Sequence, residues 1–251
     1  MQINLNYKGK SYSVDLSLPL DISIPLIPGS DAPNCFWAPH FDAAPVKSGD
    51  WIGDVNAGGG VNFKNVQINP HGNGTHTECV GHISKEKVTI NSVLKNFHHV
   101  AKVVSIYPQK LENDDKVITL QQIVDMVGDE IPEAVVIRTL PNGIEKQKRI
   151  YSGNNPPYVD HNAIKYLVEK GIKHLLLDLP SVDQEEDEGK LLSHKAFWEY
   201  PSKIDMVKTI SEMVFVDNAI PDGLYLLNLQ IVSFELDVSP SKPVLYKMEK
   251  M

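Results

Sequence analysis

The 251-residue chain has only two cysteines, Cys35 and Cys79, which are too few for a disulfide framework. No apolar run approaches the roughly 20 residues that a helix needs to span a bilayer. The first residues, Met1-Gln2-Ile3-Asn4-Leu5-Asn6, lack the charged stretch and apolar run that are typical of a signal peptide. These absences together predict a cytoplasmic protein that does not bind a membrane.

Positive charge is also scarce, with 24 Lys and Arg against 32 Asp and Glu and a formal net charge of -8. This balance argues against nucleic acid as a partner and leaves a small molecule as the expected ligand. The dense charge run over residues 183–188 is acidic and is interpreted as a solvated loop. Because no repeat, low-complexity tract or linker divides the chain, we expect a single domain over residues 1–251.

Hydrophobic periodicity predicts strands and helices that interleave without strict alternation. This order favours an α/β fold with a mixed β-sheet flanked by helices, rather than a Rossmann sheet or a barrel. Strands are expected over residues 11–18, 61–68, 100–107, 134–139, 174–179, 213–216, 223–234 and 244–247, and helices over 117–127, 160–171 and 190–198.

A long irregular excursion runs from Ser30 to Gly60 and ends in Gly58-Gly59-Gly60. Loops of this length inside a domain are uncommon and are often lids or pocket walls. A disordered linker is the alternative, but the segment is too aromatic for one. Two of its tryptophans, Trp37 and Trp51, are therefore predicted to line an aromatic substrate pocket.

The most informative stretch is Asn69-Pro70-His71-Gly72-Asn73-Gly74-Thr75-His76-Thr77-Glu78-Cys79-Val80-Gly81-His82. It gathers three histidines, a carboxylate and a cysteine among three glycines, which allow tight folding of the backbone. Imidazole and carboxylate are ligands for a divalent metal, and in extended chain His76 and Glu78 point to the same side. The cluster predicts a site for zinc or, because no thiolate is certain, manganese.

Less specific interpretations compete with this one. A single histidine such as His71 is most often solvated or hydrogen-bonded, and Cys79 is more readily a small buried hydrophobe than a soft ligand. Asp178 and Asp183 flank a Pro-Ser turn, where capping and turn chemistry account for most aspartates. The histidines at 98, 99 and 161 are expected to be structural or solvated.

The chain resembles the metal-dependent cyclase/hydrolase family that includes bacterial kynurenine formamidases, whose hallmark is a His-x-Gly-Thr-His-x-Asp-x-Pro-x-His loop. Residues 74–82 match its Gly-Thr-His core, its acid two residues later and its final histidine. Asp15-Leu16-Ser17, Val136-Ile137-Arg138-Thr139 and Leu177-Asp178-Leu179-Pro180-Ser181-Val182-Asp183 are similar to further family segments. The resemblance thus extends over most of the chain and implies the family's swivelling β/β/α-like fold.

The loop also departs from the family pattern at several positions. His71 stands five residues before His76 instead of four, which leaves its role as a ligand open. Glu78 replaces the usual Asp, and Val80 replaces the usual Pro. These differences leave room for another metal occupancy or substrate.

The resemblance implies a metal-dependent amidohydrolase that resembles arylformamidases, with N-formylkynurenine as the leading substrate in tryptophan catabolism. It implies that His71, His76, Glu78, His194 and Asp217 hold the metal, and that His82 is the general acid and base. A lactone, cyclic amide or ester hydrolase of the same family and a non-catalytic metal- or ligand-binding protein remain as alternatives. The resemblance also implies a homodimer or homotetramer, for which the excursion offers a contact surface.

Overall fold

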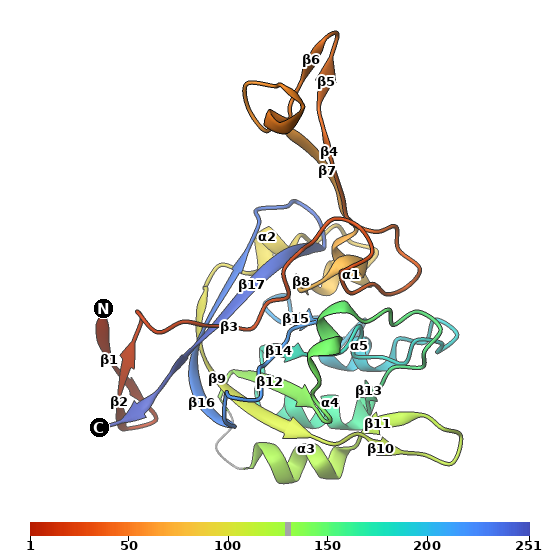
Figure 1. The fold of residues 1–251 in the computed structure, drawn as a ribbon. Helices are drawn as coiled ribbons and strands as arrows, with labels where there is room; N and C mark the ends of the chain where they lie inside the picture. Colours follow the sequence, from red (N-terminus) through yellow and green to blue (C-terminus); the bar gives the residue numbers. More distant parts are fainter. Residues whose placement is uncertain (129–131) are drawn as a thin grey trace.

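Seven strands of one mixed sheet close into a barrel-like ring in the computed structural model, which describes residues 1–128 and 132–251 (Figure 1). The strand order is β16-β9-β12-β14-β15-β8-β17-β3, and a further pairing of β16 with β17 closes the ring. The strands β9, β12, β14 and β15 are parallel to one another, and the other neighbours pair antiparallel. Their bounds are β3 (Leu20–Asp21), β8 (His76–Glu78), β9 (His98–Ile106), β12 (Ala134–Thr139), β14 (His174–Leu177), β15 (Thr209–Glu212), β16 (Gly223–Ile231) and β17 (Val238–Lys247).

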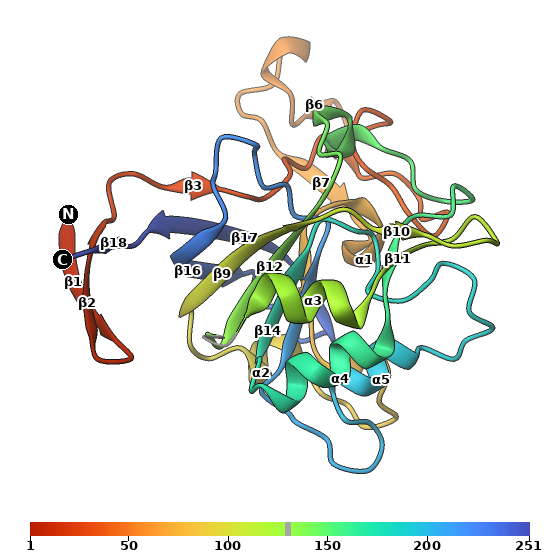
Figure 2. The same ribbon diagram turned by 90° about the horizontal axis from the view of Figure 1, so that it is seen from below.

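Two helices, α3 (Leu120–Val127) and α4 (His161–Glu169), cover the parallel strands on one side (Figure 2). Each begins at a side-chain cap, because Thr119 accepts the backbone N–H of Gln122 and Asp160 accepts that of Asn162. The short helix α5 (Leu192–Phe197) packs against α4. None of the helices within the described residues is long and apolar enough to cross a bilayer.

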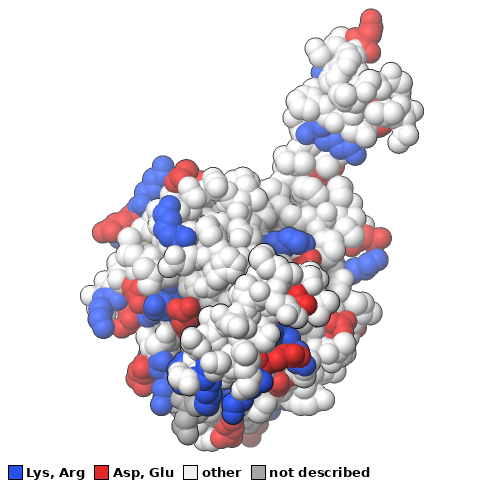
Figure 3. Space-filling model, turned by 90° about the vertical axis from the view of Figure 1, so that its left-hand side faces the viewer, with Lys and Arg blue, Asp and Glu red and all other residues white. Residues whose placement is uncertain are grey.

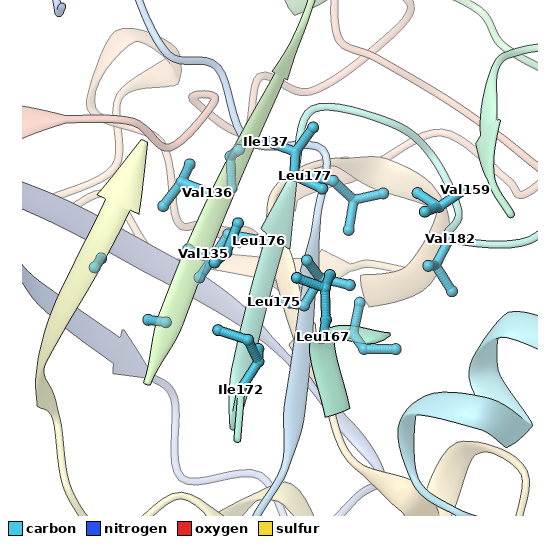
Figure 4. Packing of buried hydrophobic residues seen from close by; sticks show 14 of the residues in the cluster. Val135, Val136, Ile137, Val159, Leu167, Ile172, Leu175, Leu176, Leu177 and Val182 are labelled. Atoms are coloured by element: carbon cyan, nitrogen blue, oxygen red, sulfur yellow. The ribbon is translucent and has the colours of Figure 1, made fainter. Parts of the chain in front are cut away.

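The hydrophobic core lies between these helices and the sheet (Figure 4). The strands β12 and β14 are buried along their whole length, which explains why their sequences are continuous apolar runs. Leu167 of α4 and Ile172 pack onto them and are fully buried. Each such side chain contributes about 1.5–3 kcal/mol on leaving water, so this layer holds the strand ends rigidly in place.

Smaller elements complete the fold. One small sheet joins the two ends of the chain and consists of β1 (Gln2–Tyr7), β2 (Lys10–Asp15) and β18 (Glu249–Lys250). A second small sheet consists of β10 (Gln109–Lys110), β11 (Lys116–Ile118) and β13 (Tyr158–Val159). Helical turns are α1 (Pro70–Asn73), α2 (Ile90–Val93), η1 (Val55–Ala57), η2 (Val80–His82) and η3 (Ile144–Lys148).

A protruding arm, residues 42–67, begins within the excursion, extends beyond its end and stands clear of the domain (Figures 1 and 3). Its stem pairs β4 (Asp42–Pro45) with β7 (Lys64–Gln67), and its tip pairs β5 (Lys47–Ser48) with β6 (Trp51–Ile52). The arm exposes large apolar side chains, namely Trp51, Val55, Val61, Phe63 and Val66. On the face drawn in Figure 3, most of the arm's surface belongs to uncharged residues.

The expected α/β fold with a mixed sheet is confirmed, and most predicted elements lie within a few residues of those observed. The ring closure through β16 and β17 differs from the open sheet that the sequence favoured over a barrel. One strand assignment was wrong, because the segment 213–216 is not a strand and β15 lies four residues earlier. The strand expected over residues 61–68 is confirmed as β7, which pairs with β4 in the arm.

Candidate metal centre

Four histidines and four carboxylates meet where the parallel strands β14 and β15 end, which is the edge at which α/β folds place their sites. His71 comes from α1, His76 and Glu78 from β8, His82 from η2 and His194 from α5. Ligand atoms lie within 4.8 Å of one another in three groups of three residues, which are His71 with His76 and Glu78, His71 with His82 and Asp237, and Glu78 with His82 and His194. The carboxylates of Asp183, Glu212 and Asp237 complete the cluster.

The histidine-rich loop folds tightly because its small residues allow close approach. Asn69 caps α1 by accepting the N–H of Gly72, and Pro70 occupies the first helical turn. A Cβ on Gly72 would lie 2.3 Å from the Cβ of Ala38, and one on Gly81 would lie 2.1 Å from the carbonyl oxygen of Val88. Both positions therefore require glycine. Cys79 is fully buried in the core, where it acts as a small hydrophobe.

His76 and Glu212 face each other across the antiparallel pair β8 and β15. The Nδ1–H of His76 donates to the carbonyl oxygen of Gly74 at 2.9 Å, which leaves the Nε2 lone pair free. This Nε2 lies 3.3 Å from Glu212 Oε2, yet it has no hydrogen-bond partner among the described residues. Oε2 of Glu78 is likewise buried without one, 3.2 Å from His71 Nδ1.

His194 is aimed into the cluster by Asp183. One carboxylate oxygen of Asp183 accepts the Nδ1–H of His194 at 2.6 Å, and the two oxygens also accept the backbone N–H groups of Ser193 and His194. Nε2 of His194 then lies 3.1 Å from Glu78 Oε1 and 4.0 Å from Glu212 Oε1. Asp183 thus caps α5, as the sequence suggested, and also orients a histidine.

Asp237 holds the two remaining histidines. Its Oδ2 lies 3.0 Å from His71 Nε2 and 3.4 Å from His82 Nδ1. The other ring nitrogens, His71 Nδ1 and His82 Nε2, lie 3.2 Å and 3.8 Å from Glu78 Oε2. The rings of His71 and His82 are 4.3 Å apart, so a single carboxylate sets the orientation of both.

These contacts determine the charge of the cluster. Burial alone would raise the pKa of Glu78, but His82, His194 and His71 hold that pKa well below its ordinary value. Burial also opposes protonation of His71 and His194. The nearby carboxylates of Asp237 and Glu78 nevertheless raise the pKa of His71 to about 10, and Asp183 and Glu78 hold the pKa of His194 well above its ordinary value. The carboxylates therefore stabilise positive charge at this position.

The donor set fits a divalent cation. Imidazole nitrogens and carboxylate oxygens converge, and their outer atoms are fixed by Gly74, Asp183 and Asp237 in the arrangement typical of metal ligands. The two buried atoms without partners, His76 Nε2 and Glu78 Oε2, are ligand atoms that point at the same place. The site is suited to a metal with nitrogen and oxygen preference.

The structure brings together His71, His76, Glu78, His82 and His194, but it does not bring Asp217 to them. The exposed Asp217 accepts the N–H of Ala219 at 2.8 Å, in a turn beside Arg138. The carboxylate that does reach the cluster is Glu212, which the sequence analysis missed because it placed the strand four residues too late. The available signal was an acidic residue directly before the apolar run of residues 213–216.

The two predicted pocket tryptophans also lie outside the cluster. Trp51 is at the tip of the arm, with its ring 6.2 Å from that of Phe63, and Trp37 is 68% exposed. A cavity of about 210 Å³ opens instead beside Phe36, the neighbour of Trp37. The described residues that line it are Phe36, His71, His82, Ser181, Asp183, Gln184, Glu185, Asp187, Leu191, His194 and Glu212, with no Lys or Arg among them.

Comparison with known proteins agrees with the fold. A family model described as "Putative cyclase" matches residues 14–184, more than half of the chain. The chain therefore belongs to this cyclase family. A sequence search of curated proteins finds no match.

Solved structures share the fold at low sequence identity. A predicted metal-dependent hydrolase from Bacillus stearothermophilus is 16% identical with a TM-score of 0.64, over 91% of this chain and 98% of that one. Isatin hydrolase A from Labrenzia aggregata is 16% identical with a TM-score of 0.67, over 93% and 94%. Isatin hydrolase A from Ralstonia solanacearum is 14% identical with a TM-score of 0.64, over 91% of both chains.

Proposed function

We propose that the protein is a metal-dependent hydrolase that cleaves a formyl amide or a related C–N bond. The observation that carries this proposal is the convergence of His76 Nε2 and Glu78 Oε2, buried and without hydrogen-bond partners among the described residues. Membership of the cyclase family supports it, as do fold neighbours whose names are metal-dependent hydrolase and isatin hydrolase.

The ligands in this proposal are His76, Glu78, His194 and Glu212, with His71 as a further candidate. Zinc suits them best, and manganese is the alternative. A divalent ion bound there lowers the pKa of water and polarises a carbonyl group. Gly74, Asp183 and Asp237 keep the ligand nitrogens oriented.

His82 is the proposed proton carrier. It lines the cavity and is partly exposed, whereas His76 and His194 are buried. Its Nε2 faces Glu78 at 3.8 Å, which is longer than the contacts of His71 and His194 with that residue. In the reaction it accepts a proton from the attacking water and passes it to the departing nitrogen.

Aryl formamides such as N-formylkynurenine are the leading substrates, and cyclic aryl amides of the isatin type are the second candidate because two fold neighbours are isatin hydrolases. Phe36 supplies one aromatic wall of the cavity. The lining is acidic at Asp183, Glu185 and Asp187, so neutral substrates should be favoured over anionic ones.

The test is an assay of purified protein on N-formylkynurenine, its methyl ester, isatin and an aryl lactone, with metal content measured in parallel. We expect hydrolysis of at least one amide, and faster turnover of the methyl ester than of the free acid. A metal-loaded protein that hydrolyses lactones alone would overturn amide specificity. One that hydrolyses nothing would favour the alternative of a binding protein.

We also propose that the protein is a homo-oligomer assembled through the arm. The arm exposes Phe63 and Val66 at 57% and 65%, and an isolated hairpin of this kind has little stability in water without a partner surface. Light scattering at micromolar concentration should give a dimer or tetramer. Val66→Asp should dissociate it, whereas the matched Val207→Asp, at an exposed valine of the domain, should not. A monomeric wild type would contradict the proposal.

A further inference from the structure

A second cavity, of about 360 Å³, lies on the other side of the segment that follows β14. Asp178 and Leu179 line it, whereas Ser181 and Asp183, a few residues on, line the cavity of the candidate metal centre. The two cavities share no lining residue. We call this second one the cationic cavity, because Lys110, Lys116, Lys146 and Arg149 all line it.

Three of these cations already have carboxylate partners. Lys146 is buried and donates to Asp178 at 2.7 Å, to Asn142 and twice to Thr139, so its charge and hydrogen bonds are satisfied. Arg149 pairs with Glu145 at 2.8 Å, and Lys110 pairs with Asp114 on the surface.

Lys116 differs, because it forms no ion pair within the described residues, and its positive charge in the lining is not neutralised by any carboxylate contact among them. A chain with net charge -8 thus presents a cationic recess here.

A tyrosine hydroxyl group in the lining also has no protein partner within the described chain. Tyr151 is only 3% exposed, and its hydroxyl makes no hydrogen bond with any residue in the described parts of the chain. Its ring packs against the guanidinium of Arg149, 5.8 Å from the ring centroid. The hydroxyl is therefore available to donate a hydrogen bond to a ligand in the cavity.

The rest of the lining is apolar. Tyr107, Pro108, Leu140, Pro141, Pro157 and Leu179 form walls that suit a flat or branched hydrocarbon body. Lys146 occupies the neighbouring acceptors of Thr139 and Asp178. The polar groups that remain available to a ligand are Lys116, Arg149 and the Tyr151 hydroxyl.

We propose that the cationic cavity binds a small organic carboxylate, with its carboxylate on Lys116, Arg149 and the Tyr151 hydroxyl and its apolar body between the proline and leucine walls. A charge-assisted hydrogen bond to the ligand would give the Tyr151 hydroxyl an acceptor. Lys116, which has no ion pair within the described chain, would gain one with the ligand. This inference is independent of the reaction proposed for the metal centre.

Benzoate is the probe, with benzamide as its neutral counterpart, in calorimetric titration of the purified protein. We expect benzoate to bind with an affinity that falls as the ionic strength rises, and benzamide to bind at least tenfold more weakly. Tyr151→Phe should lower the affinity for benzoate about tenfold, and Lys116→Gln should lower it about threefold. The matched Lys165→Gln, an exposed lysine on α4, should change nothing.

A further variant separates the two cavities. Glu212→Gln alters the candidate metal centre and should leave benzoate affinity unchanged. If Glu212→Gln abolishes binding while Tyr151→Phe and Lys116→Gln retain it, benzoate occupies the metal centre and the inference is wrong. Equal binding of benzamide, or no benzoate binding up to millimolar concentration, would also overturn it. Lys116→Gln, at an exposed position, decides the matter if Tyr151→Phe fails to fold.

Discussion

Two groups of histidines occupy opposite ends of the same parallel strands. The candidate metal centre lies at the carboxyl ends of β14 and β15. His98, His99 and His174 lie at the amino ends of β9 and β14, beside Glu133, and we call them the amino-end histidines. Each group contains a pair of adjacent, mutually tilted imidazole rings, but only the first brings ligand atoms of three residues within 4.8 Å in the described chain.

The difference lies in the number of carboxylates. At the amino ends, His99 is held between Asn96 O at 2.9 Å and Glu133 at 3.2 Å, and His174 Nδ1 is bonded to Thr209. Burial, followed by the nearby His99, lowers the pKa of His174 to about 3. At the carboxyl ends, nearby carboxylates raise the pKa values of His71 and His194 instead. Proximity of histidines is therefore not enough to make a metal site, because the charge around them decides what they bind.

The largest expected effect concerns His82. His82→Ala should reduce kcat by roughly 10²–10⁴-fold, because a positioned proton carrier is lost, while the bound metal remains. Enzyme kinetics and elemental analysis of the same preparation check both halves. His71→Ala is the matched comparison in the same ring pair, and we expect it to lose part of its metal. If His82→Ala sheds its metal completely, His82 is a ligand and the division of roles is wrong.

A smaller effect is expected at Asp183, which touches His194 and not the proposed metal. Asp183→Asn should weaken metal affinity by about 10–100-fold, since the carboxylate orients and polarises a ligand histidine. Competition with a chelator measures the affinity. The matched control is Asp160→Asn, which keeps a helix-capping residue and should leave metal affinity unchanged. Asp178→Asn is not suitable as a control, because it removes the ion-pair partner of Lys146. Unaltered affinity in Asp183→Asn would remove His194 from the ligand set.

The amino-end histidines should affect the pH dependence of stability and not metal binding. The pKa of His174 is about 3 in the folded chain against an ordinary 6.5, so the unfolded chain takes up the proton first. The stabilisation is complete above pH 6.5 and is lost as the pH falls toward 3. Between pH 7 and 5 the loss is about 2 kcal/mol, a factor of about thirty in the unfolding constant.

Urea denaturation of His174→Gln at both pH values tests this expectation. The variant should lose about 2 kcal/mol less than the wild type on acidification, and His161→Gln, at a partly exposed histidine, should behave as the wild type. An identical pH dependence in wild type and His174→Gln would show that His174 is not buried in its neutral form.

The smallest effect is expected at Asp217, which the structure places away from the metal centre. Asp217→Asn should change kcat and metal content by less than about twofold, since its side chain only closes a surface turn. Activity at low micromolar protein and elemental analysis are sufficient to check it. A large loss of metal would mean that Asp217, and not Glu212, is the late carboxylate ligand.

Local sequence was a good guide wherever the site is local. His71, His76, Glu78 and His82 lie within one loop, and glycines with close packing bring them together. His194 followed from the family resemblance. Glu212 was missed because a short apolar segment does not define where its strand ends. Asp237 comes from a loop with no motif, and its place depends on pairing between β8 and β17, which are far apart in sequence.

The tryptophans illustrate the same limit. An aromatic, irregular segment predicts an ordered element, and the arm is ordered, but composition does not reveal which surface an element faces. Phe36 lines the cavity while Trp37 and Trp51 do not. The mixed sheet could be predicted from alternating patterns, whereas its closure through β16 and β17 depends on long-range pairing.

The most direct test of the account is the metal content of four purified proteins measured by elemental analysis. Wild type and His99→Gln, altered only among the amino-end histidines, should carry the same stoichiometric amount of zinc or manganese. His76→Ala and Glu212→Gln should each lose most of it, because they remove ligands proposed at the carboxyl ends of the strands. Wild-type protein that is free of metal and takes up neither ion, or equal metal in all four proteins, would contradict the central claim.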